Sequence, residues 1–245
     1  MVKLLTSYFS LSRRDAEKDF ADIKASGFDI VNLPMTEERA MFHDAHYKKL
    51  VDIAHKNDLE AWISPWGVLG VFGGEGLTEH LSTCPYSCNA RDTMNMWIYA
   101  AQVADAIHWD EPKQKCCDLR NILVNEWSPQ FNKPQSVYSN LDFDEPYVLP
   151  APSGIFVDIY NNPANINVFK TTFFGPGHTY GVWVKAFRTI GEVVEHSLTR
   201  ALNADLDYVG VWGYNGCDEV PMLRSSEDTW PTVKQVIRDF KGDNL

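Results

Sequence analysis

The chain has 245 residues, of which 44% are hydrophobic and 13% aromatic, so it can bury a sizeable core and is not a disordered chain. Its formal net charge of −11 disfavours a nucleic-acid partner and an anionic membrane surface, because both would need a basic face. A neutral ligand such as a sugar is compatible with this charge.

Cellular location is predicted from the N-terminus and the cysteines. The first residues run directly into strand-like sequence, without the apolar core and cleavage site of a signal peptide, and no apolar run approaches 18 residues. The five cysteines are an odd number in a chain too long for a disulfide scaffold. We expect free thiols in a cytoplasmic protein, with no bound metal and no cofactor, although a four-cysteine zinc site stays open as an alternative.

The N-terminal part switches between the two hydrophobic periods that distinguish strands from helices. A capping-box-like pattern opens the first helix and Gly27 ends it. The predicted elements are, in order, a strand at residues 3–9, a helix at 12–26, a strand at 28–34, a helix carrying Tyr47, Leu50, Val51 and Ala54 on one stripe, and a strand at 60–64.

The middle of the chain holds a predicted strand that ends in two adjacent acids. A glycine-rich segment at residues 67–76 is predicted to be a mobile flap, and a helical stripe follows that includes Met94. Residues 106–110 then alternate as a buried strand, which runs into two adjacent acids and is stopped by Pro112. Two acids at the carboxyl end of a strand are costly to hold unless solvent, a metal or a substrate meets them.

The C-terminal part continues the alternation of strands and helices. Strands are predicted at residues 135–139, 154–160, 181–187 and 207–214, with helices that include Leu119, Val194 and Val233. Two connections, at residues 141–153 and 161–180, show no helical stripe. The fifth and sixth helices are therefore predicted to be short, irregular or absent.

Eight strands alternating with helices predict a parallel α/β sheet, and eight units in about 250 residues favour a closed barrel. No G-x-G-x-x-G opens the first helix, which counts against a dinucleotide-binding sheet. We expect one domain, residues 1–245, with the fold of a single (β/α)8 TIM barrel.

The carboxyl ends of barrel strands meet at one mouth, where the chemistry of such folds is placed. Acids among aromatic rings suit a sugar, because ring faces stack on pyranoses and carboxylates supply acid/base chemistry. For any single tryptophan, packing at the rim is the better explanation. The candidate catalytic residues are Glu111, Asp110 and Asp158, and the candidate substrate-binding residues are Tyr8, Asn32, Trp66, Glu75, Tyr160, Lys185, Trp212 and Tyr214.

The sequence Trp109-Asp110-Glu111-Pro112 at the end of the fourth strand resembles the Asn-Glu-Pro of clan A glycoside hydrolases. This resemblance implies that Glu111 is the general acid/base. Clan A enzymes also carry a nucleophilic Glu at the end of strand seven, where this chain has Lys185. The second acid must then come from elsewhere, and Asp158 is the leading candidate.

The sequence leaves other catalytic roles and other functions of this predicted site open. Some retaining α-glycosidase barrels use a strand-four Asp nucleophile with a strand-six acid, which would give these roles to Asp110 and Asp158. A metal-dependent sugar isomerase could use His108 as a ligand, although a hydrogen-bonded core histidine is more common. A Schiff-base lyase could use Lys185, and the barrel could also bind saccharide without catalysis. The expected partner is a small-molecule or oligosaccharide substrate, and the sequence leaves the oligomeric state unknown.

Overall fold

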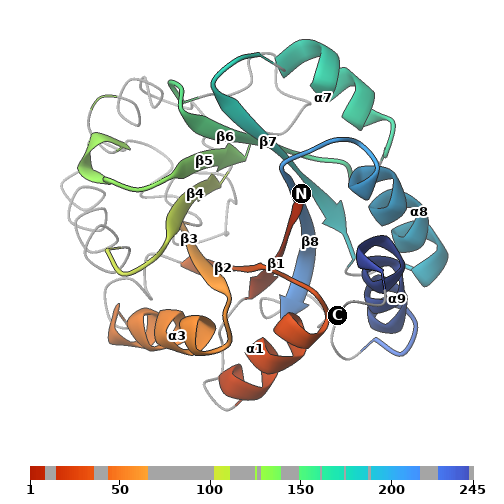
Figure 1. Ribbon diagram of the computed structural model, residues 1–245, viewed down its shortest axis with the longest axis horizontal. Coiled ribbons are helices and arrows are strands. Elements are labelled where there is room, and N and C mark those ends of the chain that lie inside the picture. The colour runs from red at the N-terminus through yellow and green to blue at the C-terminus, as the bar shows by residue number, and fades with distance from the viewer. Residues whose placement is uncertain are drawn as a thin grey trace, which may run out of the picture.

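The computed structural model is a closed barrel of eight parallel strands in sequence order (Figure 1). The structure describes residues 1–8, 15–35, 44–65, 102–110, 125, 128–138, 149–160, 162–173, 175–186, 189–215 and 226–242. The strands are β1 (Lys3–Tyr8), β2 (Ile30–Met35), β3 (Glu60–Pro65), β4 (Ala106–Asp110), β5 (Gln135–Tyr138), β6 (Ser153–Asp158), β7 (His178–Lys185) and β8 (Tyr208–Asn215). Each predicted strand is present, within three residues at either end.

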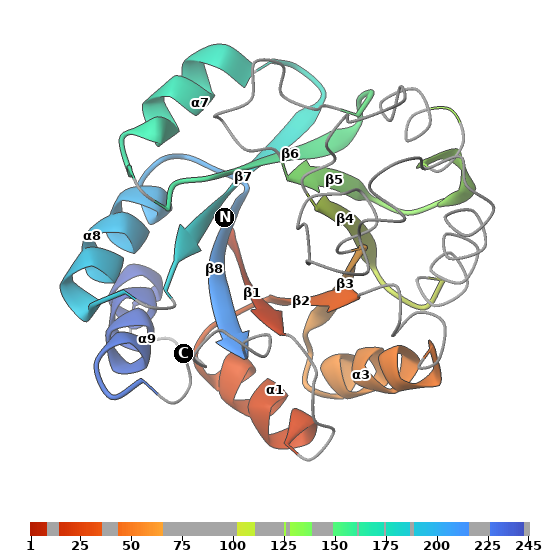
Figure 2. The same cartoon turned by 180° about the vertical axis from the view of Figure 1, so that it is seen from behind.

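Five α-helices are found among the described residues, and they lie outside the barrel (Figures 1 and 2). They are α1 (Ala16–Ala25), α3 (Asp44–Lys56), α7 (Asn165–Phe173), α8 (Gly191–Leu202) and α9 (Thr229–Lys241), with a 3-10 turn, η2, at Ser128–Gln130. The predicted helices around Met94 and Leu119, and most of the fifth connection, lie outside the described residues. Within the described residues, none of the helices combines the length and the apolar character that crossing a bilayer requires.

The sixth connection contains the short helix that the sequence left as one of three options. The helix α7 has nine residues and buries Ile166 and Phe169, while Val168 on its other side is exposed. Its start is fixed locally, because the side-chain oxygen of Asn162 accepts the backbone N–H of Ala164 at 2.9 Å. Only two apolar positions face the barrel, so the helical period is hard to see in the sequence.

Side chains alternate between the two sides of the barrel wall, as the pleat of a strand requires. One buried cluster fills the barrel interior and consists of Leu5, Ile30, Trp62, Ala106, Tyr138, Phe156 and Trp183. A larger one lies between the strands and the helices. The barrel is therefore a packed core up to the level of these residues.

Two glycines make room for the largest rings of the interior. A Cβ on Gly181 would lie 2.3 Å from the ring of Phe156, and one on Gly210 would lie 2.3 Å from the ring of Trp183. Gly181 pairs with Phe156 across β6 and β7, and Gly210 pairs with Trp183 across β7 and β8. Each large ring thus fills the space that a side chain at the paired glycine of the neighbouring strand would occupy.

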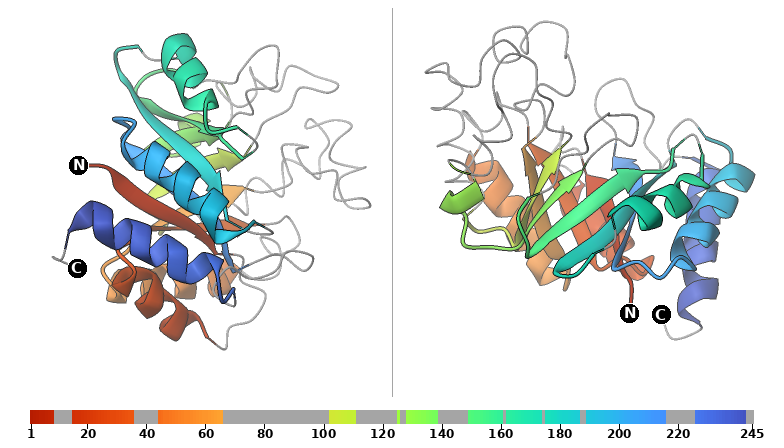
Figure 3. Two further views of the ribbon diagram at one scale, coloured as in Figure 1. Left: turned by 90° about the vertical axis from the view of Figure 1, so that its right-hand side faces the viewer. Right: turned by 90° about the horizontal axis from the view of Figure 1, so that it is seen from above.

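Aromatic and acidic residues join the first helix to the last strand and the last helix. Asp22 of α1 accepts hydrogen bonds from the Tyr214 hydroxyl at 2.9 Å and from the Trp230 indole at 3.2 Å. The ring of Phe28 stacks on Trp230 with centroids 6.1 Å apart. These contacts close the barrel on the flank where both termini lie (Figure 3).

Candidate active site at the barrel mouth

The strand ends place two acids at the same end of the barrel. All eight strands are parallel and their arrowheads point the same way in Figure 3. Asp110 ends β4 and Asp158 ends β6, with Tyr138 at the end of the strand between them. Asp110 pairs with Tyr138 in the register of β4 and β5. The two predicted acids thus stand on the same rim of the barrel, two strands apart, with Tyr138 on the strand between them.

A hydrogen bond orients one of these acids. The hydroxyl of Tyr138 donates to Oδ2 of Asp158 at 2.8 Å. Tyr138 is buried, Asp158 is half-buried, and Asp110 is only 2% exposed. A donated hydrogen bond stabilises a carboxylate and limits its rotation. The carboxylate of Asp158 is therefore held in place at the edge of the packed interior.

Below the rim, His108 connects three strands through its ring. It lies two residues before Asp110, so it faces the same side of β4. Its Nδ1 is 2.7 Å from the hydroxyl of Ser136 on β5, and the indole N–H of Trp183 on β7 donates to its Nε2 at 3.1 Å. Nε2 is then the bare nitrogen of a neutral ring, and Nδ1 carries the proton that is donated to Ser136.

Burial fixes the charge state of this imidazole. Complete removal from water lowers the pKa of His108 from 6.5 to about 3. Because both ring nitrogens are already engaged, His108 is a core histidine and offers no lone pair to a metal. Within the described part of the chain, no three His, Cys, Asp or Glu side chains are grouped to hold a metal ion.

Three of the predicted binding residues lie on the inner side of the rim. Tyr160 and Trp212 are half-buried and pack against the interior cluster, and the Trp212 ring meets Trp183 edge-on at 5.5 Å. Lys185 ends β7, two residues after the inward-facing Trp183, and pairs with Trp212 in the register. These residues stand on β7, on β8 and just beyond β6.

Asn32 lies deeper than predicted. It follows the inward-facing Ile30 by two residues and is completely buried. Among the residues that the structure describes, which include its strand neighbours Ser7 and Trp62, neither the amide nitrogen nor the amide oxygen of Asn32 has a hydrogen-bond partner. A buried amide without a hydrogen-bond partner lowers the stability of the folded chain.

The prediction that Tyr8 and Tyr214 line the mouth is wrong. Tyr8 faces α1, where its hydroxyl donates to Asp19 at 2.9 Å and its ring meets Phe20 edge-on. Tyr214 also points outward and packs against Tyr8 at a centroid distance of 6.3 Å. Both rings are buried between the barrel wall and the helices.

The physical reasons for these two outward positions differ. In β1 the inner positions include Leu5, so simple alternation turns Tyr8 to the outside. In β8 the alternation itself is interrupted: Gly213 has a positive φ of 105°, and the register with β1 shifts between Thr6 and Tyr8. This irregularity turns the side chain that follows Gly213 away from the interior.

Three predicted site residues, Glu111, Trp66 and Glu75, lie outside the described residues, so their roles stay predictions. Trp109, by contrast, is fully buried on the outside of β4, where its indole donates to Gln135 at 2.9 Å and its ring meets Phe131. For this tryptophan, packing is the correct explanation.

Sequence reasoning missed the small polar partners inside the barrel. Ser136 holds the His108 ring, and Ser64 on β3 donates to the backbone oxygen of His108 at 2.7 Å. Both are inward-facing serines in strands otherwise rich in apolar residues. A serine at a core position of a predicted strand was the available signal.

No family model matches this sequence, and a search of curated proteins finds no significant match. Solved structures do match. A GH5_18 variant from Bifidobacterium longum subsp. longum ATCC 55813, in complex with Manb1-4GlcNAc, superposes with a TM-score of 0.68 at 10% identity, covering 98% of this chain and 78% of that one. The chain has the TIM-barrel fold.

Other TIM barrels of different activity match as well. A truncated 3-deoxy-D-arabino-heptulosonate 7-phosphate synthase from Thermotoga maritima gives a TM-score of 0.58 at 8% identity, covering 98% of this chain and 85% of that one. D-psicose 3-epimerase in the presence of D-fructose gives 0.51 at 10% identity, with 98% and 97% covered. At such identities the likeness establishes the fold alone, and function has to be argued from the mouth.

Proposed function

We propose that this protein hydrolyses a glycosidic bond in a neutral saccharide by carboxylate acid/base catalysis. The observation that carries the proposal is the arrangement of Asp110, Tyr138 and Asp158 on three consecutive strand ends, with Tyr138 hydrogen-bonded to Asp158. Glycoside hydrolysis needs two carboxyl groups on either side of the scissile bond, one of them in its charged form. The hydrogen bond from Tyr138 favours that form at Asp158.

The division of roles follows from position. Glu111 comes directly after Asp110, and by the resemblance to clan A it is the proton donor to the leaving oxygen. Asp158 is then the second carboxylate, acting as nucleophile or as the base that activates water. If Asp110 is instead the nucleophile, Asp158 becomes the acid. The anomer released at the start of the reaction, followed by NMR, distinguishes retention from inversion.

The surroundings of these acids support a saccharide substrate. Tyr160 and Trp212 present half-buried rings at the same rim as the acids, and aromatic faces stack on the apolar faces of sugar rings. Lys185 at the same rim offers donors for a substrate hydroxyl. The net charge of −11 favours a neutral saccharide over an anionic one. The GH5_18 neighbour with bound disaccharide is consistent with this choice of ligand class.

The direct test is turnover of aryl glycosides and oligosaccharides by the purified full chain and by acid-to-amide variants. Glu111→Gln and Asp158→Asn are expected to lower kcat by about 10²–10⁴-fold, the usual contribution of a catalytic acid or base. Tyr138→Phe should lower kcat by a smaller factor, because it removes the hydrogen bond that orients the Asp158 carboxylate but leaves the carboxylate in place. Asp52→Asn, the same change at an exposed position of α3, is the matched control and should leave the rate unchanged.

Thermal unfolding of each variant separates a lost catalytic group from a lost fold. A folded Glu111→Gln protein that hydrolyses substrate at the normal rate removes Glu111 as proton donor. Normal rates in all three acid variants, with Asp110→Asn as the third, remove the hydrolase proposal altogether.

A second candidate function is saccharide binding without catalysis. It is favoured by Lys185, which stands at the end of β7 where clan A enzymes carry their nucleophile. Binding of a saccharide that is never hydrolysed, with an affinity unchanged by Glu111→Gln, would identify this function. Trapping of a carbonyl substrate on Lys185 by borohydride would instead identify a Schiff-base lyase. Loss of activity on addition of a chelator would identify a metal-dependent isomerase. A cytoplasmic location, suggested by the odd number of cysteines, remains part of the proposal.

A further inference from the structure

Below the proposed acids, aromatic rings from four strands surround the imidazole of His108. The ring of Phe156 meets it edge-on with centroids 4.8 Å apart, and the rings of Trp62 and Trp183 lie at 6.1 and 5.6 Å. The ring of Tyr138 is nearly parallel to the imidazole, at a centroid distance of 6.5 Å and an interplanar angle of 17°. Because the interior is closely packed, a rotation of the imidazole would displace at least one of these rings.

Hydrogen bonds fix the imidazole at both of its nitrogens. Nδ1 donates to the hydroxyl of Ser136 at 2.7 Å, and Nε2 accepts from the indole of Trp183 at 3.1 Å. The two partners stand on β5 and β7, on either side of β6, and both are buried. A ring that is held at both nitrogens cannot turn without breaking a hydrogen bond. The plane of the His108 ring is therefore fixed.

Tyr138 joins this fixed ring to the acid at the end of β6. It follows Ser136 by two residues, so both side chains point into the barrel from β5. In the register of β4 and β5 it stands diagonally across from His108, a spacing that aromatic side chains can bridge. Offset parallel rings at this distance attract each other. The Tyr138 hydroxyl donates to Asp158 at 2.8 Å, so the plane of the Tyr138 ring decides where this donor points.

We propose that His108 is a positioning residue for the site: its fixed ring sets the plane of Tyr138, and Tyr138 in turn holds the carboxylate of Asp158. The inference rests on the proposed function, since it is there that Asp158 has a catalytic role. His108 acts through Tyr138, because its own ring is buried and engaged at both nitrogens. A buried polar network whose hydrogen bonds are all made stiffens its surroundings, which suits this role.

The test removes one hydrogen bond of the imidazole at a time and follows kcat and KM on a substrate that the wild-type chain hydrolyses. Ser136→Ala leaves Nδ1 without its acceptor, and Trp183→Phe leaves Nε2 without its donor but keeps a ring. Each variant that folds should lower kcat by about tenfold, because a displaced carboxylate loses part of the advantage of orientation. KM should stay the same, since both side chains are buried below the rim.

Combination with Tyr138→Phe shows whether the effect passes through Tyr138. If it does, Ser136→Ala should lower kcat by less than about twofold in the Tyr138→Phe protein, although it lowers kcat by about tenfold in the wild type. Trp183→Phe should behave in the same way. A full further loss of about tenfold in the Tyr138→Phe protein would overturn the proposal, because His108 would then act by another route.

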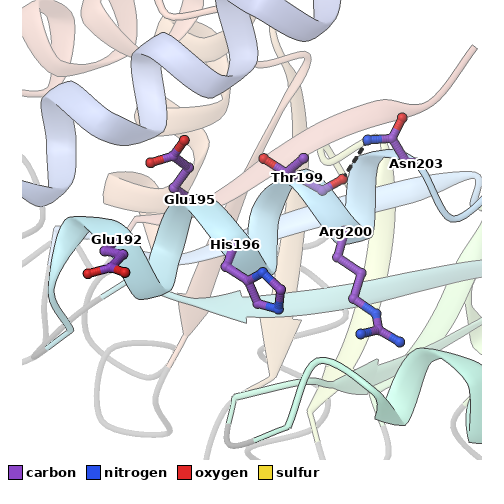
Figure 4. Close-up of a pocket in the computed structure, with 6 residues that line it drawn as sticks. All are labelled: Glu192, Glu195, His196, Thr199, Arg200 and Asn203. Carbon is purple, nitrogen blue, oxygen red and sulfur yellow. Dashed lines mark hydrogen bonds between the residues drawn. The ribbon is translucent and has the colours of Figure 1, made fainter.

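Two control variants separate positioning from stability. Ser153→Ala removes a buried hydroxyl that lies 3.0 Å from Nδ1 of His178 at the start of β6, the end of the barrel opposite to the acids. Thr199→Ala removes an exposed hydroxyl from a groove on the outer face of α8 (Figure 4). Both should keep the wild-type kcat, and circular dichroism checks that every variant is folded. An equal loss of kcat in Ser153→Ala would overturn the proposal, because any lost buried hydrogen bond would then have the same effect.

A measurement without substrate keeps this inference separate from the proposed function. The NMR signal of the Tyr138 ring carbon that bears the hydroxyl reports the hydrogen bond to Asp158, and its absence in Tyr138→Phe assigns it. In Ser136→Ala and Trp183→Phe it should move toward its position in Asp158→Ala, which lacks the acceptor. A wild-type chain that hydrolyses nothing would remove the proposed function, and this signal would still decide whether His108 positions Tyr138. A signal that is unmoved in both variants would overturn the proposal.

Discussion

The neutral, buried imidazole of His108 makes a quantitative prediction about stability in acid. Its pKa in the folded chain is about 3, whereas an unfolded histidine titrates near 6.5. Between these values the unfolded chain binds a proton that the folded chain does not. The contribution of this residue to stability is therefore complete above pH 6.5 and is lost progressively as the pH falls toward 3.

The size of the effect follows from linkage. One such proton changes the free energy of unfolding by about 1.4 kcal/mol per pH unit within this window. Going from pH 6.5 to 4.5 should then cost about 2 kcal/mol from His108 alone, because the unfolded histidine is already half protonated at pH 6.5; this is a large share of the total stability of an ordinary domain. Other groups add their own pH dependence, so the comparison has to be made against a variant.

The variant His108→Gln isolates this contribution. A glutamine cannot titrate but can still accept from Trp183 and donate to Ser136, so the network is kept. Urea unfolding of both proteins, followed by tryptophan fluorescence at several pH values, gives their difference in free energy of unfolding. That difference should shift by about 2 kcal/mol in favour of the variant between pH 6.5 and 4.5.

The matched control is His196→Gln, which removes an exposed imidazole from α8. Its difference from the wild type is expected to change little with pH, because this side chain is exposed in the folded chain and lies outside the barrel interior. A difference between wild type and His108→Gln that stays constant from pH 6.5 to 4.5 would refute the assignment of a neutral, desolvated His108.

Three further substitutions test the barrel by equilibrium unfolding and, for the first, by ligand binding. Asn32→Leu should raise the free energy of unfolding by about 1–2 kcal/mol, because it removes an unsatisfied buried amide. If Asn32 contacts the substrate, the variant should also bind saccharide more weakly. A destabilised variant would show that the amide has a structural partner. Gly181→Ala should destabilise by about 1–3 kcal/mol, because its methyl group would overlap the ring of Phe156, and an unchanged midpoint would contradict the close packing. Tyr214→Phe should cost about 1–2 kcal/mol through the lost hydrogen bond to Asp22, with no effect on turnover; reduced turnover at unchanged stability would return this residue to the mouth.

Much of the fold could be predicted because strands and helices differ in hydrophobic period. The strand at residues 106–110 shows why, since its alternation and the following proline fixed both its extent and its end. The helix α7 shows the limit. Its period rests on Ile166 and Phe169 alone, in a segment otherwise rich in asparagine, so the pattern did not distinguish a short helix from an irregular loop.

The candidate site was predictable only where the alternation continues to the strand end. The alternation of side chains along a strand correctly places Asp110 on the inner side of β4 and Asp158 on the inner side of β6. For Tyr214 the same count fails, because Gly213 adopts a conformation that no period reports. The bond between Tyr138 and Asp158 joins residues on neighbouring strands, and a hydrophobic period carries no information about such pairs.

The link from Asp22 to Tyr214 and Trp230 also sets an order for assembly during synthesis. The bonded residues are separated by 192 and 208 positions, so the side chain of Asp22 can meet both partners only after nearly the whole chain has been synthesised. Until then the aromatic ring of Phe28 lacks its stacking partner and remains open to other contacts. The hydrogen bonds that join the first helix to β8 and α9 are thus among the last that synthesis of the chain allows to form.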